Sequence, residues 1–491
     1  MRLPAGKLRI TSAFLALSLI MTGCASTGGI VPQRQPRDMS SFDVGAAVRA
    51  ADRSARWPDA DWWRNYGDAQ LDALVAGAVA DSPTLAAADA RVRQAQSLAG
   101  VAAAALAPHV EGNLSVKREH WPDNPLYYGP GTLADRNTWN NTGTLEFSYR
   151  LDLWGGDEHA REQALDVAQA RAADARAARL ELEVDLVRAY VDFSKQYALR
   201  DIAVDTLARQ HQLADLAARR LRGGIGTQLE VSQAQAPLPE YERQIEALDE
   251  AIELDRNQLA ALAGKGPGTG AALTRPTLAL DAPAALPSVL PADLIGHRPD
   301  VVAARWAVAG AARGVDVAHA AFYPNIDLVA TLGGFAAGGP LFQFLNAANG
   351  DWTAGPALSL PIFEGGALRG RLGAAAAGYD EAVEHYNAAV VSALKQIADE
   401  IVRLRSLDAQ QREAQRSATA ARRSYELAQV GFKRGLSDYV DVIVSETQWL
   451  GAQQRVAQIH AARLAAYASL MGALGGGLAA PADGPSPGEM R

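Results

Sequence analysis

The sequence of 491 residues has a single cysteine, few aromatic residues and only eight histidines, and each scarcity excludes a class of protein. One cysteine allows neither an intrachain disulfide framework nor a multi-cysteine metal cluster. The histidines form no HExxH motif or closely spaced pair, and the GxSxG motif is absent from the sequence. We therefore expect no enzymatic activity, no metal site and no cofactor.

A strong excess of charge of one sign is also missing. The net charge is -8 at pH 7 and the pI is about 5.6, with basic residues spread among acidic ones. This mixing is typical of solvated helix faces and gives no electrostatic footprint for nucleic acid, so no nucleic-acid partner is expected. The glycine-rich stretch Gly264–Gly270 follows a helical run and has no strand before it, which predicts a flexible joint and not a phosphate loop.

The chain begins with a short apolar run that ends near its only cysteine. Ile10–Met21 follows three basic residues and is too short to span a membrane as a helix, which is typical of a signal peptide, here over residues 1–23. The run Met-Thr-Gly-Cys resembles the bacterial lipoprotein signal, in which the cysteine, here Cys24, becomes lipidated, for example with palmitate. A chance cysteine after a cleaved peptide is the alternative. Ala25 stands where an aspartate would resemble an inner-membrane retention signal, which implies sorting to the outer membrane.

Sequence landmarks recur at a nearly constant spacing. Pro83 corresponds to Pro299 and Pro108 to Pro324, each pair 216 residues apart. The stretches LWGG and RLRGGIGTQLEV correspond, in the same order, to IFEGG and GFKRGLSDYVDV. Self-similarity of this kind indicates a tandem duplication. The predicted units are a lipidated tether over 24–60, repeat 1 over 61–263, a Pro/Gly joint over 264–291, repeat 2 over 292–475 and a C-terminal tail over 476–491.

Each repeat is predicted to contain a helix, a strand hairpin and two long helices. Prolines open and end the first helix, because proline suits the first turn of a helix and breaks its interior. The first helices are predicted over 84–107 and 300–323. The hairpins are predicted over 108–154 and 324–363, and the long helices over 157–222 and 228–262 in repeat 1 and over 366–434 and 437–474 in repeat 2.

The hairpins contain the sequence pattern of amphipathic strands. In His109–Val116, apolar or small residues alternate with polar ones, which is the period of a strand. The other strand segments alternate in the same way, and aromatic residues flank them. Alternating segments of about ten residues with aromatic flanks are typical of strands in outer-membrane barrels. A soluble sheet with one core face and one wet face is the alternative for any single strand.

The long helical segments favour the barrel interpretation. Residues 157–222 contain neither proline nor glycine, so an uninterrupted helix would reach about 100 Å. Its two apolar stripes need a neighbour on each side, as in a closed ring of helices. One chain has too few helices and strands to enclose an open lumen, so several chains must complete the ring. The stripes are Leu180, Val184, Val187 and Val191, and Leu182, Leu186, Tyr190, Phe193 and Tyr197.

These motifs together resemble one known family. The stretches DWWRNYGDAQLDALVAGAV, LIGHRPDVVAARWAV, AAFYPNIDL, SYRLDLWGG, LSLPIFEGG and GFKRGLSDYVDV are similar to those of the outer-membrane factor family, the TolC-like efflux ducts, in its NodT-type lipoprotein branch. The resemblance implies a mixed α and β fold, mainly α. It also implies a homotrimer with a twelve-stranded barrel in the outer membrane, continuous with a long periplasmic α-helical barrel.

The function that the resemblance implies is conduction. The trimer would be the outer-membrane channel of a tripartite efflux system, and it would pass drugs or other toxic small molecules from an inner-membrane transporter and a periplasmic adaptor to the exterior. A non-conducting periplasmic coiled-coil lipoprotein is the alternative. That alternative explains the helices and Cys24, but it leaves four amphipathic strands without a purpose.

The resemblance also implies where the channel closes. Its periplasmic aperture would lie at the tips of the second helical hairpin, in GLSDYVDVIV. There Asp441 would form a ring of three carboxylates, with Asp438 nearby and an apolar ring from Val440 or Val444. Rings of carboxylates favour cations. The alternative is that Asp438 and Asp441 are solvent-facing carboxylates that favour the first turn of a helix through its dipole.

Small residues at the predicted tips resemble the motifs that receive periplasmic adaptor proteins. They are Gly224 and Thr227 in the first turn and Gly435 and Ser437 in the second. These residues could equally form only helix caps and turns. Pro237 and Pro239 interrupt the first returning helix and are expected to kink or break it.

Overall fold

The computed structural model describes residues 26–37, 41–43, 45–49, 57–122, 136–279 and 297–477. The predicted signal peptide, Cys24 and most of the predicted tail lie outside the described residues. The helices are α2 (Gly45–Arg49), α3 (Ala69–Asp81), α4 (Pro83–Ala104), α5 (Gly156–Arg222), α6 (Gln228–Gln235), α7 (Leu238–Leu262), α8 (Pro267–Gly270), α10 (Pro299–Ala320), α11 (Ala367–Lys433) and α12 (Tyr439–Ala473). The strands are β1 (His109–His120), β2 (Asn137–Leu151), β3 (Asn325–Gly339) and β4 (Gly350–Ser359), and short 3-10 turns include η2 (Trp62–Tyr66).

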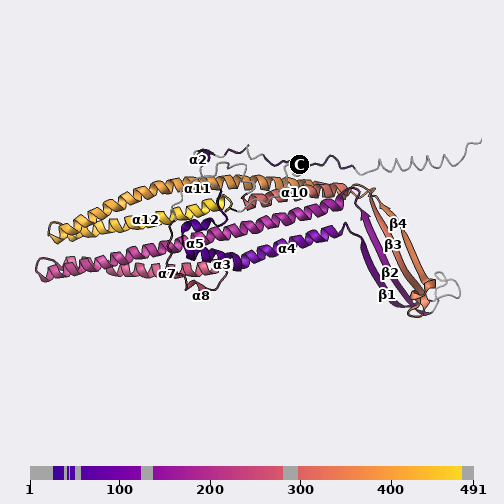
Figure 1. Ribbon diagram of the computed structural model, residues 1–491, viewed down its shortest axis with the longest axis horizontal. Helices are drawn as coiled ribbons and strands as arrows, with labels where there is room; N and C mark the ends of the chain where they lie inside the picture. Colours follow the sequence, from indigo (N-terminus) through magenta and orange to yellow (C-terminus); the bar gives the residue numbers. More distant parts are fainter. Residues whose placement is uncertain are drawn as a thin grey trace, which may run out of the picture.

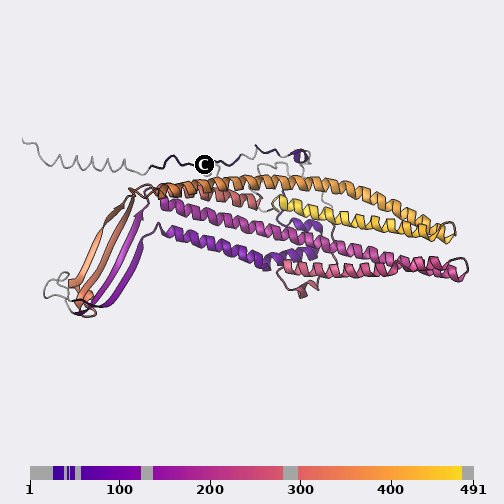
Figure 2. The same ribbon diagram turned by 180° about the vertical axis from the view of Figure 1, so that it is seen from behind.

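The molecule is a long helical layer with a sheet at one end (Figures 1 and 2). Helices α5 and α11 have 67 residues each and run the length of the layer. Near the sheet α4 and α10 pack beside them, and toward the far end α7 and α12 take these places. The order across the layer is therefore α4 or α7, then α5, then α10 or α12, then α11. Each strand is joined in sequence to a helix of this layer: β1 and β3 follow α4 and α10, and β2 and β4 precede α5 and α11.

Both predicted apolar stripes of α5 contain buried residues. Leu186 and Tyr190 from one stripe and Val187 and Val191 from the other are fully or almost fully buried. One stripe cannot face two neighbours at once, so the burial of both matches a helix with a partner on each side, here α4 or α7 and α10 or α12. Burying a large apolar side chain contributes about 1.5–3 kcal/mol, and this core therefore fixes the order of the layer.

Proline divides the returning helix of the first repeat. The sequence predicts a returning helix over 228–262 that Pro237 and Pro239 kink or break, and the structure has α6 and α7 with a break at Ala236 and Pro237. Pro237 has no backbone N–H to donate to the preceding turn, and Pro239 lies in the first turn of α7, where proline is well tolerated. In the second repeat the returning helix α12 continues for 35 residues without a break.

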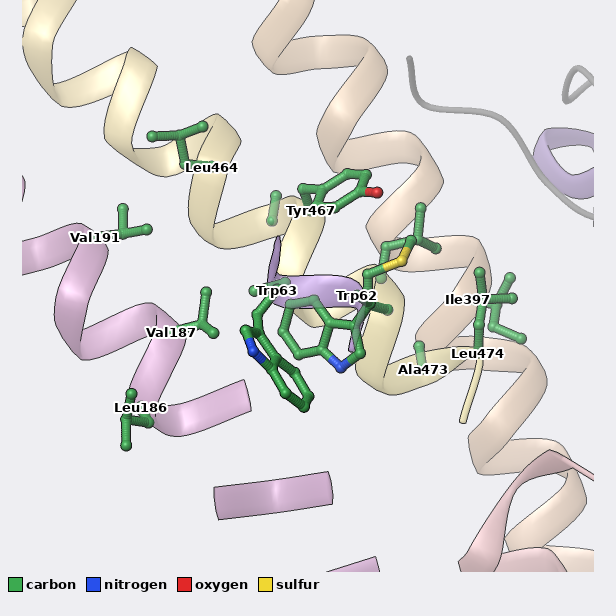
Figure 3. Packing of buried hydrophobic residues seen from close by; sticks show 14 of the residues in the cluster. Trp62, Trp63, Leu186, Val187, Val191, Ile397, Leu464, Tyr467, Ala473 and Leu474 are labelled. Carbon is green, nitrogen blue, oxygen red and sulfur yellow. The ribbon is translucent and has the colours of Figure 1, made fainter. Parts of the chain in front are cut away.

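The thickest part of the core lies halfway along the layer. Trp62 and Trp63 of η2 are buried between α12 and α5, against Tyr467 and Val187 among others (Figure 3). The Tyr66 hydroxyl donates a hydrogen bond to the backbone oxygen of Leu464 at 2.7 Å. The N-terminal motif DWWRNY therefore packs against the layer at the level where α4 and α10 meet α7 and α12.

Arg298 joins the ends of α10 and α12 at this level. Its side chain is 6% exposed, and its guanidinium donates to the Asp300 carboxylate, to the Gln396 side-chain oxygen of α11 and to the Ala473 backbone oxygen at the end of α12, at 2.6 to 3.0 Å. One buried side chain therefore satisfies a carbonyl at a helix end, which would otherwise lack a partner.

The sheet is a single antiparallel layer in the order β1-β2-β3-β4. The register aligns Gly112, Leu145, Leu332 and Trp352 in one row across all four strands. The next row, on the opposite face, contains Asn113, Thr144, Gly333 and Asp351.

Both faces of this sheet are largely exposed. Leu145, Leu332 and Trp352 are 56%, 62% and 73% exposed, so their apolar face is not covered by the helical layer. Among the described residues, β1 pairs only with β2 and β4 only with β3, which leaves both edges open. Within the described part of the chain no single helix is long and apolar enough to cross a membrane, although the bent pair α3 and α4 meets that test when taken together.

The predicted tether is partly docked onto the helical layer. Residues 26–37 run along α11 in an extended conformation (Figure 1). The backbone N–H groups of Gln33 and Arg34 donate to the Asp380 carboxylate at 2.8 Å, and Arg369 donates to the Ser26 backbone oxygen at 2.8 Å. These contacts could not be predicted from the sequence, because a segment without apolar periodicity can bind through its backbone.

Replacing Arg298 with methionine is expected to destabilise the fold by about 2–4 kcal/mol, because the Ala473 carbonyl and the Gln396 amide lose a charged hydrogen-bond donor in a buried place. The temperature at which the helical circular dichroism signal is lost measures this effect. Arg416→Met, which removes an exposed arginine of α11, is the matched control and should leave that temperature almost unchanged. Equal midpoints for the two variants would show that Arg298 does not hold the junction.

Candidate functional site at the helical tips

The first helical tip is a glycine turn followed by a capped helix. Gly224 has a φ of 73°, in the left-handed region that favours glycine. Thr227 is the N-cap of α6: its hydroxyl accepts from the Glu230 N–H at 3.2 Å, and its own N–H donates to the Glu230 carboxylate at 3.4 Å. This reciprocal pair is a capping box, so both predicted contact residues also have a structural role.

The second tip repeats this arrangement. Gly435 has a φ of 77°, and Asp438 is the N-cap of α12 with Asp441 as its capping-box partner. The Asp438 N–H donates to the Asp441 carboxylate at 3.4 Å, and the Ser437 hydroxyl donates to the Ala428 backbone oxygen at 3.3 Å. The alternative role, in which these carboxylates favour the first turn of a helix, is therefore present in the structure.

The predicted aperture residues nevertheless share an exposed face. Val440 and Val444 are 51% and 50% exposed and lie one helical turn apart, with Asp441 exposed beside them. A carboxylate that caps its own helix still presents its charge to the surroundings, so capping and a place in a carboxylate ring are compatible. Whether three copies bring these side chains together stays a prediction.

Both tips pack on each other within one chain. The buried cluster between them takes Leu213, Ala217 and Val231 from the first hairpin and Phe432 and Tyr439 from the second. Several polar contacts cross the same interface.

Two α5 side chains make these contacts. The Gln210 amide donates to the Tyr439 hydroxyl at 2.8 Å and to the Ala234 backbone oxygen at 2.9 Å. Arg220 lies over the Phe432 ring, 4.8 Å from its centroid, and donates to the Phe432 backbone oxygen at 3.3 Å. The two tips therefore form one unit in which α6 and α12 are held to α5.

Sequence reasoning missed the buried polar groups of this interface. Glu446 is 2% exposed, and Arg209 of α5 approaches it at 3.9 Å. A signal was present, because Glu446 follows Tyr439 and Val442 at helical spacing and so occupies an apolar stripe of α12. A charged residue at such a buried position is rare unless it is paired. Its partner Arg209 could not be found in this way, since the two residues are far apart in sequence.

The described residues contain no group of three or more histidine, cysteine, aspartate or glutamate side chains placed to hold a metal ion. The features that the structure does contain are a bare amphipathic sheet, a long helical layer and two packed tips.

Comparison with known proteins assigns these features to a family. The model of the family described as outer membrane efflux protein matches residues 74–265 and 290–476. The chain is 53% identical over 497 residues to the fusaric acid resistance protein FusA of Burkholderia cepacia, covering 99% of this chain and 91% of that protein.

Solved structures show the same fold. The outer membrane protein VceC of Vibrio cholerae matches with a TM-score of 0.79 and 33% identity, over 86% of this chain and all (100%) of that one. The outer-membrane channel OprN matches with a TM-score of 0.81 and 25% identity, over 92% of this chain and 99% of that one. The predicted fold class, the outer-membrane location and the prediction of a channel and not an enzyme are confirmed. The chain belongs to the outer membrane efflux protein family.

Proposed function

We propose that this chain forms, as a homotrimer, the outer-membrane channel of a tripartite efflux system. The observation that carries the proposal is the sheet, which is continuous with the helical layer and has one apolar face, one polar face and two open edges. In a bilayer every backbone polar group must find a partner, so open edges have to be closed by other copies. Three copies would give twelve strands, with lipid outside and water inside.

The partners in this proposal meet the far end of the helical layer. A helix of 67 residues is about 100 Å long, so the tips would lie deep in the periplasm when the sheet is in the outer membrane. Ile225 and Leu436 are exposed at the tips beside Gly224, Thr227, Gly435 and Ser437. Exposed apolar residues next to small ones suit a protein partner, which supports an adaptor that links the channel to an inner-membrane transporter.

The cargo in this proposal is small toxic molecules, with aromatic carboxylic acids such as fusaric acid among them. The support is the 53% identity to a protein named for fusaric acid resistance. A strain lacking the gene should be inhibited by lower concentrations of fusaric acid, and the intact gene should restore growth. Equal sensitivity with and without the gene, while resistance to other drugs changes, would redirect the proposal to another cargo.

The proposal also includes a lipid on Cys24 that holds the chain at the membrane. Ser26, two residues after it, binds Arg369 at the start of α11, immediately after strand β4 and its linker. The docked segment therefore leads the N-terminus back to the level where the strands pass into helices. A lipid on Cys24 would enter the inner leaflet at that level and hold the N-terminus at the membrane without spanning it.

Purified trimers are expected to conduct ions in a planar bilayer, and Asp441→Ala is expected to raise their single-channel conductance about twofold. The variant removes both a side chain and its charge from the proposed constriction, where carboxylates bind cations. Asp441→Asn keeps a capping acceptor and tests the charge alone. Glu230→Ala, which removes the equivalent capping carboxylate of the first tip, is the control and should conduct like the unaltered protein.

Two results would contradict these expectations. Intact trimers without conductance would favour the non-conducting lipoprotein. Equal conductance in all four proteins would remove Asp441 from the aperture.

Cys24→Ser is expected to abolish labelling of the protein by radioactive palmitate, because a serine cannot be lipidated in this way. The protein should still reach the outer-membrane fraction, since the proposed barrel holds it there independently of the lipid. Mass spectrometry of the N-terminal peptide provides the direct check. An unmodified cysteine or an intact residue 1–23 segment in the mature protein would contradict the proposed anchor.

A further inference from the structure

Glu446 is a buried carboxyl group at the place where the two hairpins of one chain meet. It lies two turns into α12, on the face that packs against α5, and only 2% of the residue is exposed. The elements around it supply four polar groups that face it, which are Arg209 from α5, Tyr241 from α7, Tyr425 from α11 and Tyr439 from α12 itself. Arg209 is the only charged group among these four.

Arg209 compensates the carboxylate poorly. Its guanidinium lies over the Trp449 ring, 4.5 Å from the centroid, and donates to the Thr206 hydroxyl at 2.9 Å. These contacts leave its Nε 3.9 Å from Oε1 of Glu446, and both atoms are buried without a hydrogen-bond partner. A buried ion pair without a hydrogen bond regains little of the cost of removing two charges from water.

This environment favours the neutral acid. Burial raises the pKa of Glu446 from 4.5 to about 7, although the positive charge of Arg209 acts in the opposite direction. Burial also raises the pKa of Tyr425 and of Tyr439 to about 12, and it raises the pKa of Tyr241, so these phenols remain neutral. In the cluster formed by Glu446 and the four groups that face it, Glu446 is therefore the group whose charge changes near neutral pH.

Proton binding is thereby linked to the packing of the hairpins. When α12 moves away from α5, water reaches Glu446 and its pKa returns toward 4.5, so the packed state binds the proton more tightly than the separated state. The packed state is thus favoured below pH 4.5 and loses this advantage as the pH rises to about 7. Across that whole range the equilibrium between the two states shifts by up to about 300-fold per chain.

The corresponding position of the first hairpin has no titratable side chain. Gln235 follows the N-cap Thr227 by the same eight residues that separate Glu446 from the N-cap Asp438. Glutamine has nearly the shape of glutamic acid but does not titrate. Gln235 is moreover exposed at the end of α6, whereas Glu446 is buried, so the two hairpins differ here both in charge and in burial. The buried carboxyl group lies in the hairpin that contains the predicted aperture.

We propose that Glu446 makes the packing of the second hairpin against α5 dependent on pH, with the hairpins packed when its carboxyl group is protonated and loosened when the proton leaves. Each chain that loosens releases one proton. The consequence for transport rests on the proposed channel function, because loosening of α12 would widen the periplasmic end. The free energy that an adaptor needs to separate the hairpins would then be smaller at neutral pH than at acidic pH.

The first test measures hairpin separation and needs no conduction. Val442→Cys places a thiol at a position that is fully buried (0% exposed) between the hairpins, and Leu427→Cys places one at an exposed position of α11, outside the predicted aperture residues. Maleimide labelling rates are read from the tip peptide by mass spectrometry, and the ratio of the two rates corrects for thiol ionisation. From pH 5.5 to 8 the ratio is expected to rise about 30-fold, and at least tenfold.

The same ratio in the Glu446→Gln background decides the proposal. It should stay at the low value of the acidic sample at every pH, because glutamine keeps the neutral shape. Glu426→Gln, which neutralises an exposed carboxylate of α11, is the control and should leave the rise intact. Ala234→Cys on α6 provides a second buried reporter in case Val442→Cys disturbs the packing. A flat ratio in the unaltered background, or an equal rise in Glu446→Gln, would overturn the proposal.

Channel recordings separate this inference from the proposed function. The open fraction of the unaltered trimer is expected to rise from pH 5.5 to 8, whereas Glu446→Gln should remain mostly closed throughout. Conductance that is present but equal at all pH values would overturn the pH dependence and leave the channel function standing. Absence of conductance in every variant would overturn the channel function, and the labelling ratio would still decide the role of Glu446.

Discussion

The arrangement of the whole molecule depends on the unpaired outer edges of β1 and β4. Each edge presents a row of backbone groups that the described part of the chain does not satisfy, and the sheet between them has an apolar face without a covering layer. In water such a sheet would aggregate, and in lipid its edges would be costly unless closed. Closure by further copies, as proposed above, answers both problems, and it would place α11 of one copy beside α4 and α7 of the next.

The helical layer also has apolar surface that needs a partner. A helix packed on both sides needs two apolar stripes, and α5 has them in the region of Leu186, Val187, Tyr190 and Val191. At the middle of the layer the tryptophans of η2 and the guanidinium of Arg298 add a second tier of contacts where the short helices meet end to end. The sheet and the tips are thus connected through a closely packed centre.

Local patterns in the sequence were enough to predict much of this architecture. The alternation in His109–Val116 reflects a sheet with two different faces, and the absence of proline and glycine between 157 and 222 reflects an unbroken helix. Contacts between distant segments left no such pattern. The docking of residues 26–37 depends on backbone N–H groups, and the position of Arg209 near Glu446 depends on how α5 meets α12. At the tips, glycine and capping residues were recognised, but their packing on each other required the structure.

The end-to-end arrangement of α10 and α12 has a mechanical consequence. No peptide bond joins them at their meeting point, where Arg298 and close packing provide the connection. The covalent path from α12 runs out to the tip and back along α11. A rotation of α12 about its own axis can therefore be absorbed at this discontinuity as slip between two helix ends. The strands would keep their register, so the tips can change shape while the sheet keeps its own.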